Sequence, residues 1–565
     1  MGTQITGSSS LNPIPHVHPN TTTHVNTLPV SQTPISANRQ HPHTTLNMPE
    51  IEGYYKNTPD RVTYVKDWET SANDWIPMTD EEKARVQTMD LPNPRCPNIP
   101  PVKDVEELLP SLDAVAKRPY SGGLWPAWDL RKGEKVLVKM SNWHHPMVID
   151  AVRKILERYE TDFHIEIQDK GPAPQWQGHD EAEYYLDRTK ELAEWIDSWE
   201  VMDREGKWDK VIQGYGGPIL RERKIKIQRM PFIVPEAVVS PCHQLPAEVL
   251  VAIDEWAWKR IRACKRVHIT DPEGTDLRYT NHDAYWNDTR EIYRRDHVER
   301  HYSANVPYGE TYLPGHIWGR PPFMIPQEDG EGVIKGTMNH IAPYPRMEMT
   351  IKNSVITDIK GGGIFGEKLR NLAAHTGGTQ YSGFNAPGIM QWWEASIGTS
   401  PKIHRPRENY ANGFNCGLYE RMRAGVIHIG FGTIISADTE RADALAGKLV
   451  GHWHVHLYFP TYVAEDINGE DVTIIEHGRL KALDDPEVRA IAAKYGDPDE
   501  LLREDWIPAI PGLNMAGDYN EHYAKDPYRY TMMELDLCRD YHPLFQKLVA
   551  GGRDGGEVNG GCCSK

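Results

Sequence analysis

The stretch that decides the fold runs from Ala424 to Thr461 and consists of two apolar segments joined by a polar one. The first reads Ala424-Gly-Val-Ile-His428-Ile-Gly-Phe-Gly432, and the second reads Gly451-His452-Trp-His454-Val-His456-Leu-Tyr-Phe-Pro460. β-Branched and aromatic residues bounded by Gly and Pro are typical of strands. Alternate side chains of a strand share a face, so the three histidines of the second segment should point one way. The residues between them should form an apolar backing, which is the support that a rigid metal site needs.

Spacing restricts which of these histidines can bind the same ion. Residues two apart in a strand lie roughly 6.5–7 Å apart, so two imidazoles that each reach about 2.1 Å to a metal can meet there. Residues four apart lie roughly 13 Å apart and cannot. The pair is therefore His452/His454 or His454/His456, and His454 belongs to both. A histidine-rich strand without metal is the alternative, but three alternating histidines with His428 nearby favour a metal site.

The composition excludes several classes of protein. The chain has 565 residues and a formal net charge of -17, so we expect two or three domains and no nucleic-acid partner. Its 17 Trp and 26 Tyr exceed its 9 Phe, and such amphipathic rings suit a polar-aromatic pocket as well as a large core. No stretch is long and apolar enough to span a bilayer. The scattered cysteines form no disulfide framework, which indicates a reducing compartment and a cytoplasmic location.

The domain organisation is predicted from shifts in composition. Residues 1–50 are rich in Thr, Ser, Pro, Asn and His and should form a disordered tail. Residues 51–120, with a helix at 79–89, should wrap the body of the protein. An N-terminal α/β domain is expected over 121–300 and a C-terminal metal-binding catalytic domain over 301–540. Residues 541–565 should form a flexible tail.

The predicted N-terminal domain has the pattern of an open sheet flanked by helices. Gly133–Met140 has the composition of a short apolar strand, and the spacing of apolar residues in Pro146–Tyr159 predicts a helix directly after it. Acidic segments over 181–199 should be helical, and 208–213 should be a further strand. Pro246–Lys265 should be a long helix that leads into the strand Arg266–Thr270. Strand, short loop and helix in this order indicate an α/β sheet.

A series of short motifs then resembles a known superfamily. The motifs are, in chain order, the strand 266–270 with Gly274-Thr-Asp-Leu277, Asn305-Val-Pro-Tyr-Gly-Glu310, Gly336-Thr-Met-Asn-His340 with the strands 347–351 and 355–362, Trp393-Glu394-Ala-Ser-Ile-Gly-Thr-Ser-Pro401, Glu420 to Gly432, and His454-Val-His456. From about residue 133 to residue 478 the chain resembles the aminopeptidase T-like metallopeptidases and the dihydroxypyridine ring-cleaving dioxygenases that share their fold. Each motif is short, and their common order makes the series specific.

The resemblance implies a fold and a set of site residues. The fold is α/β, a two-domain aminopeptidase T-like architecture with an N-terminal open sheet flanked by helices and a C-terminal metal-binding α+β domain. In the peptidases, a two-metal centre would use the residues that correspond to Glu310, Glu394, Glu420, His428, His454 and His456. In the dioxygenases, a single iron would use the last three. The family habit of closed dimers also implies a homo-oligomer.

Position 456 departs from both branches, which carry Asp where this chain has His456. Loss of an anionic ligand weakens a two-metal centre, whose ions need carboxylates to offset their mutual repulsion. A single Fe(II) loses less, because the three imidazoles of His428, His454 and His456 can still hold it and favour an anionic chelating substrate. We therefore expect a non-haem Fe(II)-dependent dioxygenase that cleaves a hydroxylated aromatic or heteroaromatic ring with dioxygen. A two-metal metallo-aminopeptidase that uses Zn, Co or Mn is the alternative, because the glutamates of the peptidase set remain.

The other candidate residues have both functional and structural interpretations. The candidate catalytic groups are Glu310, His340 and Glu394, although the last two could equally be structural. Glu420 and His452 could orient a ligand histidine or take the place of one. The candidates for stacking on an aromatic substrate are Tyr308, Trp318 and Trp393, and core packing is the commoner use of such side chains.

Overall fold

The computed structural model describes residues 102–118, 126–141, 144–168, 201–213, 225–280, 315–320, 329–403, 420–504, 517–518 and 521, except for residues 231, 233, 340–342, 385 and 434–436. All of them lie in one compact unit, Leu46–Lys565. The helix predicted at 79–89, the acidic segments at 181–199 and both predicted tails lie outside the described residues.

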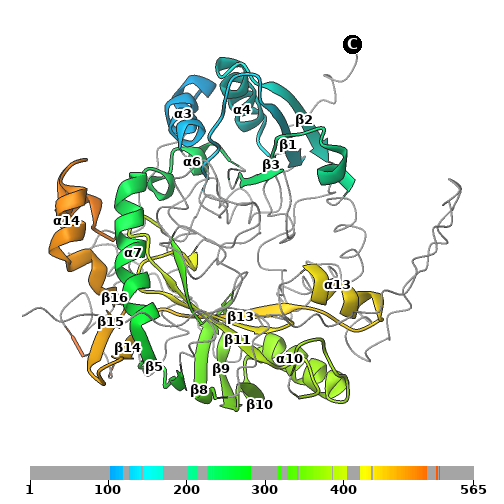
Figure 1. The fold of residues 1–565 in the computed structure, drawn as a ribbon, viewed down its shortest axis with the longest axis vertical. Helices are drawn as coiled ribbons and strands as arrows, with labels where there is room; N and C mark the ends of the chain where they lie inside the picture. The colour runs from blue at the N-terminus through cyan, green and yellow to red at the C-terminus, as the bar shows by residue number, and fades with distance from the viewer. Residues whose placement is uncertain are drawn as a thin grey trace, which may run out of the picture. The chain divides into compact units, whose positions relative to one another are not determined.

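A parallel sheet of four strands follows the first helices of the described chain. Its strands are β1 (Lys135–Ser141), β2 (Asp162–Gln168), β3 (Lys210–Gln213) and β4 (Lys226–Arg229), in the order β2-β1-β3-β4. The helix α4 (Pro146–Arg158) begins directly after β1, where the His145 side chain accepts a hydrogen bond from the Met147 amide and Pro146 occupies the first turn. Apolar residues of α4, β1 and α3 (Leu109–Lys117) form one buried cluster (Figure 1). The predicted succession of strand and helix is confirmed here.

A second sheet has eight strands, in the order β10-β9-β8-β6-β5-β14-β15-β16. Its strands are β5 (Cys264–Thr270), β6 (Asp276–Thr280), β8 (Glu331–Met338), β9 (Pro343–Lys352), β10 (Val355–Gly361), β14 (Thr461–Asp466), β15 (Asp471–Glu476) and β16 (Arg479–Leu480). Because β5 pairs with β14 and β6 pairs with β8, this sheet contains strands from both sides of residue 300. Pairing partners more than 50 residues away decide where β5 and β6 lie, and composition does not record that distance.

A third sheet has the order β13-β12-β11-β7, and each of its strand pairs is antiparallel. Its strands are β7 (His316–Arg320), β11 (Trp392–Gly398), β12 (Ile427–Gly432) and β13 (His452–Leu457). Side chains of this sheet and of the eight-stranded sheet belong to one hydrophobic cluster. The two sheets approach closely at Gly336, where a Cβ atom would lie 2.3 Å from Val455 Cγ1. A glycine is needed there because the β8 backbone meets a side chain of β13.

The remaining helices cover these sheets or connect their strands. They are η1 (Val105–Leu108), α6 (Pro235–Val238), η3 (Pro241–His243), α7 (Ala247–Ala263), α10 (Gly363–Thr376), α13 (Ala437–Leu445), η5 (Lys481–Asp484), α14 (Pro486–Ala492) and α15 (Pro498–Leu501). Apolar residues of α7 and α10 belong to the same cluster as the two antiparallel sheets. The long helix predicted at Pro246–Lys265 is confirmed as α7. The mixed α/β class is confirmed as well.

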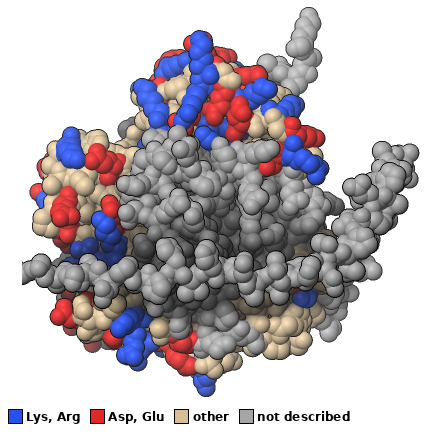
Figure 2. Space-filling model, viewed as in Figure 1, with Lys and Arg blue, Asp and Glu red and all other residues tan. Residues whose placement is uncertain are grey.

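The described surface mixes charges of both signs. Figure 2 shows Lys and Arg side chains interspersed with Asp and Glu side chains over α3 and α4. Ion pairs such as Lys154–Glu106 and Arg153–Asp150 account for part of this pattern. Within the described ranges, the longest apolar helices are still too short or too polar to cross a lipid bilayer.

Candidate metal centre

Strand register brings five histidines and one glutamate to the same face of the third sheet. His428 lies opposite His456, and Gly430 lies opposite His454 on one side and Glu394 on the other. Gly432 lies opposite His452, and Gly398 lies opposite His316. Trp453, Val455 and Leu457 belong to the hydrophobic cluster on the other face, as the alternation of β13 predicts.

Gly430 leaves the space in which these side chains meet. A Cβ atom at this position would lie 2.4 Å from His452 Nε2 and 2.9 Å from Glu394 Oε2. The two side chains therefore cross above the bare backbone of β12. A register shift between Trp392 and Glu394 in β11 places the glutamate opposite this glycine. Such bulges re-aim side chains and are frequent next to active sites.

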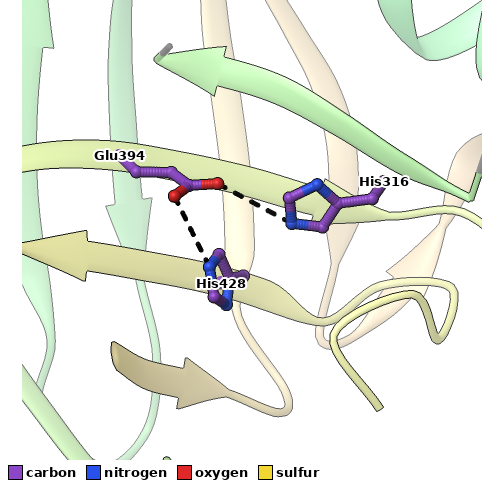
Figure 3. A group of neighbouring side chains, drawn as sticks. All are labelled: His316, Glu394 and His428. Atoms are coloured by element: carbon purple, nitrogen blue, oxygen red, sulfur yellow. Dashed lines mark ion pairs between the residues drawn. The ribbon is translucent and has the colours of Figure 1, made fainter. Parts of the chain in front are cut away.

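Glu394, His316 and His428 form the first group of neighbouring ligand atoms, and these atoms all lie within 4.8 Å of one another. Figure 3 shows the carboxylate between the two imidazole rings, with one oxygen directed toward each. His316 Nε2 lies 3.8 Å from Glu394 Oε1, and His428 Nε2 lies 3.6 Å from Glu394 Oε2. Ser396 donates a hydrogen bond of 2.7 Å to Oε1, which fixes the carboxylate.

Glu394, His452 and His454 form a second group with the same 4.8 Å limit. His452 Nδ1 lies 3.0 Å from the carbonyl oxygen of Thr433, so this nitrogen carries the proton that the carbonyl accepts. In the neutral ring, the lone pair of Nε2 then faces Glu394 Oε2 at 3.2 Å. Two acceptors at this distance repel each other unless a proton or a metal ion lies between them. Two ligands that are each about 2.1 Å from one ion lie about 3 Å apart, so the arrangement fits a metal.

His456 interacts with His428. His456 Nε2 lies 3.2 Å from His428 Nδ1, the ring nitrogen opposite the one that faces the carboxylate. The rings of His428 and His454 are stacked with their centroids 4.4 Å apart. These contacts hold the His428 ring from two sides.

Burial sets the charges of this face. Burial by itself raises the pKa of the Glu394 carboxyl, but the His428, His452 and His316 imidazoles hold that pKa well below its usual 4.5. Burial lowers the pKa of His428 to about 4, against the opposing effect of Glu394. Burial and the Arg421 guanidinium lower the pKa of His316 well below 6.5. At neutral pH Glu394 is therefore an ionised carboxylate and His428 and His316 are neutral imidazoles, the protonation states in which such groups bind metals.

The residues present fit a divalent transition metal. Each of the two groups offers two imidazole nitrogens and one carboxylate oxygen. This set of two histidines and one carboxylate is the ligand pattern of non-haem Fe(II) sites, and the same donor types also suit zinc, cobalt and manganese. The carboxylate of both groups is Glu394 on β11, which is separated from β13 by β12 in the sheet.

The other predicted site residues have varied positions. Glu420 is buried and accepts a hydrogen bond of 2.9 Å from the Tyr458 hydroxyl. Trp393 is buried in the hydrophobic cluster, where its indole N–H donates to the Gly432 carbonyl oxygen. Trp318 lies in β7 opposite Ser396, and nothing is described of its side chain. Tyr308, Glu310 and His340 lie outside the described residues.

His316 is the one member of these groups that the sequence analysis does not predict. It precedes an apolar pair in a short segment, and none of the quoted motifs contains it. The positive φ of Gly315, +85°, marks a turn before β7 and is the local signal for a strand start at His316. Nothing local indicates that this strand would pair with β11.

No family model matches the chain, and no curated protein sequence matches it. Among the solved structures that are similar to it, two share 15% sequence identity with it. One is 2,5-dihydroxypyridine dioxygenase from Pseudomonas putida KT2440, with a TM-score of 0.35 over 67% of this chain and 98% of that one. The other is wild-type AmpT from Thermus thermophilus, with a TM-score of 0.38 over 66% of this chain and 99% of that one. Their names correspond to the two branches that the motif series resembles, and at these TM-scores the likeness says nothing about the reaction.

Proposed function

We propose that the protein is a non-haem Fe(II)-dependent dioxygenase that cleaves a hydroxylated aromatic or heteroaromatic ring. The observation that supports it most is the approach of His452 Nε2 to Glu394 Oε2, with the tautomer of His452 set by a backbone carbonyl. His454 completes a group of two histidines and one carboxylate at that point. We assign the ion to this group.

Charge favours one ion over two. Glu394 is the one carboxylate of both ligand groups among the described residues. A single anion leaves a net charge of about +1 on one divalent ion but about +3 on two, and closely spaced ions need bridging carboxylates to offset their repulsion. The excess positive charge of a single-ion site suits an ionised ring hydroxyl.

The chain's own residues have separate roles in this proposal. Bound Fe(II) would supply open positions for dioxygen and for the ring hydroxyls of the substrate. Glu394 balances the charge of the ion, and the Ser396 hydroxyl donates a hydrogen bond to Oε1 of Glu394. The Thr433 carbonyl orients His452, as partners of metal-binding histidines commonly do. His428 and His456, which the sequence predicts as ligands, form a hydrogen-bonded pair beside the ion.

Reconstitution with metal tests the proposal. Metal-free protein is loaded anaerobically with Fe(II), its iron content is measured, and oxygen uptake is followed with dihydroxylated benzenes and pyridines. We expect one iron per chain and oxygen uptake with at least one such compound, both lost in Glu394→Ala. The exposed His375 on α10 supplies the control, since His375→Ala should retain both. Stoichiometric iron without oxygen uptake on any compound of this class would contradict the reaction while keeping the centre.

The second candidate function is a two-metal aminopeptidase. It is favoured by one observation, that Glu394 belongs to both ligand groups and so could bridge two ions. Glu310 and Glu420 would then have to supply further negative charge. Two zinc or cobalt ions per chain, with hydrolysis of aminoacyl anilides and no oxygen consumption, would select this candidate over the dioxygenase.

Several finer features belong to the same proposal. They are the two-domain layout with the metal in the C-terminal part, catalytic roles for Glu310 and His340, and substrate stacking by Tyr308, Trp318 and Trp393. A homo-oligomer in the cytoplasm is proposed on the sequence evidence alone. Mass determination in solution tests the oligomer directly.

A further inference from the structure

A buried carboxylate on α7 ties together the ends of two strands of the metal-binding sheet. Asp254 is 1% exposed. It accepts a short hydrogen bond from the Thr399 hydroxyl and a bond of 3.2 Å from the Gly315 amide. Gly315 precedes β7, and Thr399 follows β11. The Thr399 amide also donates to the Gly315 carbonyl oxygen at 3.0 Å, so the two strand ends are joined once directly and once through Asp254.

The strand that Asp254 holds is β7, and its register needs this support. Among the described strands, β7 lies at the edge of its sheet, has five residues and is hydrogen-bonded to β11. The pairing shifts register between Ala395 and Ser396. A slip of one residue in a short edge strand would turn every side chain to the opposite face. His316 would then leave the face of Glu394.

Asp254 binds the residues next to the cross-strand pair of His316 and Gly398. His316 lies opposite Gly398, and Asp254 binds their immediate neighbours, Gly315 and Thr399. The carboxylate approaches from the α7 side, where Ile317 packs in the hydrophobic cluster. His316 therefore faces Glu394 because the other face of the same strand is anchored.

We propose that Asp254 is a positioning residue that fixes His316 against Glu394. This inference rests on the proposed metal centre, because His316 Nε2 lies 3.8 Å from Oε1 of Glu394, the carboxylate assigned to the ion. A buried carboxyl group costs more free energy than an apolar side chain of α7 would at the same place. Its use here is geometric, since its two oxygens bind donors that flank two different strands.

A double-mutant cycle on metal affinity tests whether Asp254 acts through His316. Thr399→Val removes the hydroxyl at nearly constant volume, and the affinity for Co(II) or Fe(II) is measured for wild type, Thr399→Val, His316→Ala and the double variant. Groups that orient a metal-binding set typically change metal affinity 10- to 100-fold, so we expect about a tenfold loss in Thr399→Val. In the His316→Ala background, the same change should have no further effect. Equal losses in both backgrounds would overturn the proposal.

Amide hydrogen exchange provides a test that is independent of metal. Amide hydrogen exchange in metal-free Thr399→Val should rise in β7 and stay unchanged in β13; equal protection of β7 in variant and wild type would overturn the proposal. Thr376→Val is the matched control, because Thr376 also has a buried hydroxyl that bonds backbone groups in the same core.

Asp254→Asn should keep most of the metal affinity that is lost in Asp254→Leu, since an amide can still bond both the Thr399 hydroxyl and the Gly315 amide. A wild-type protein that binds no metal would refute the metal centre. The exchange result would then decide by itself whether Asp254 and Thr399 hold β7 in place.

Discussion

At the scale of the residue, Gly430 decides whether the metal centre can form. Gly430→Ala places a methyl group 2.4 Å from His452 Nε2, a distance that no side chain can keep without moving. We expect metal affinity to fall at least tenfold, with a loss of about 1–3 kcal/mol in stability from overpacking. Gly378→Ala is the control, since nothing lies within 4 Å of its added Cβ. Titration with Co(II) measures the affinity, and unaltered affinity in Gly430→Ala would place the ion elsewhere.

The buried histidine His428 makes the metal-free protein sensitive to acid. Its pKa is about 4 in the folded state and about 6.5 when unfolded. Between these values the unfolded chain takes up a proton that the folded protein refuses, so stability falls as the pH falls from 6.5 to 4. The full shift of about 2.5 pKa units corresponds to about 3 kcal/mol. Glu394 adds a further loss only below pH 4.5, because its folded pKa is depressed.

Urea unfolding of the metal-free protein at pH 7.5, 6 and 5 measures this effect. His428→Gln should show a flatter dependence on pH over the same range, because one titrating group is removed. Equal stability of the wild type at pH 7.5 and pH 5 would show that His428 titrates normally.

At the scale of the element, β13 presents three histidines whose roles differ by register. His452 and His454 share a ligand group with Glu394, whereas His456 bonds to His428. We therefore expect His452→Ala and His454→Ala to remove stoichiometric metal. His456→Ala should lower the affinity about 10- to 100-fold, the usual effect of losing a group that orients the centre.

Metal content after dialysis at fixed free Co(II) separates these outcomes. If His456→Ala loses the metal and His452→Ala keeps it, the pair His454/His456 binds the ion instead. The pairs His452/His454 and His454/His456 both have the strand spacing that allows a shared ion. This comparison therefore decides which pair binds the ion.

At the scale of the whole molecule, the metal should join strands from distant parts of the chain. The two ligand groups draw on β7, β11, β12 and β13, which span residues 316 to 457. A ligand that binds only the folded state stabilises it by about 4 kcal/mol at a thousandfold excess over its Kd. We expect chelation to lower the unfolding midpoint and Fe(II) or Co(II) to restore it. Mg²⁺ should not, because it prefers oxygen ligands.

Thermal unfolding with and without a chelator measures this stabilisation. Glu394→Ala supplies the control, since it should unfold at the same temperature in both conditions. A chelator effect that persists in this variant would point to a metal bound outside the described groups.

Local patterns were sufficient to predict much of the fold. The alternation in β13, the strand β12, the helix after β1 and the long helix α7 follow from periodicity and from Gly and Pro, which act over a few residues. The sheet that β5 and β6 join could not be predicted in the same way. β5 and β6 join the eight-stranded sheet through partners about 190 and 50 residues further along the chain, and their own composition suits either sheet.

The sequence by itself determined that three alternating histidines share one face of a strand with an apolar backing, because the pleat of a strand has a period of two residues. Only the tertiary structure decided which of them meet a carboxylate. Glu394 reaches His452 across Gly430 because of the pairing of three strands and a bulge in β11. His316 joins the same face from an edge strand, 78 residues before Glu394 in the chain. Register between strands so far apart depends on packing and turn geometry along the whole chain, and no short pattern in the sequence records it.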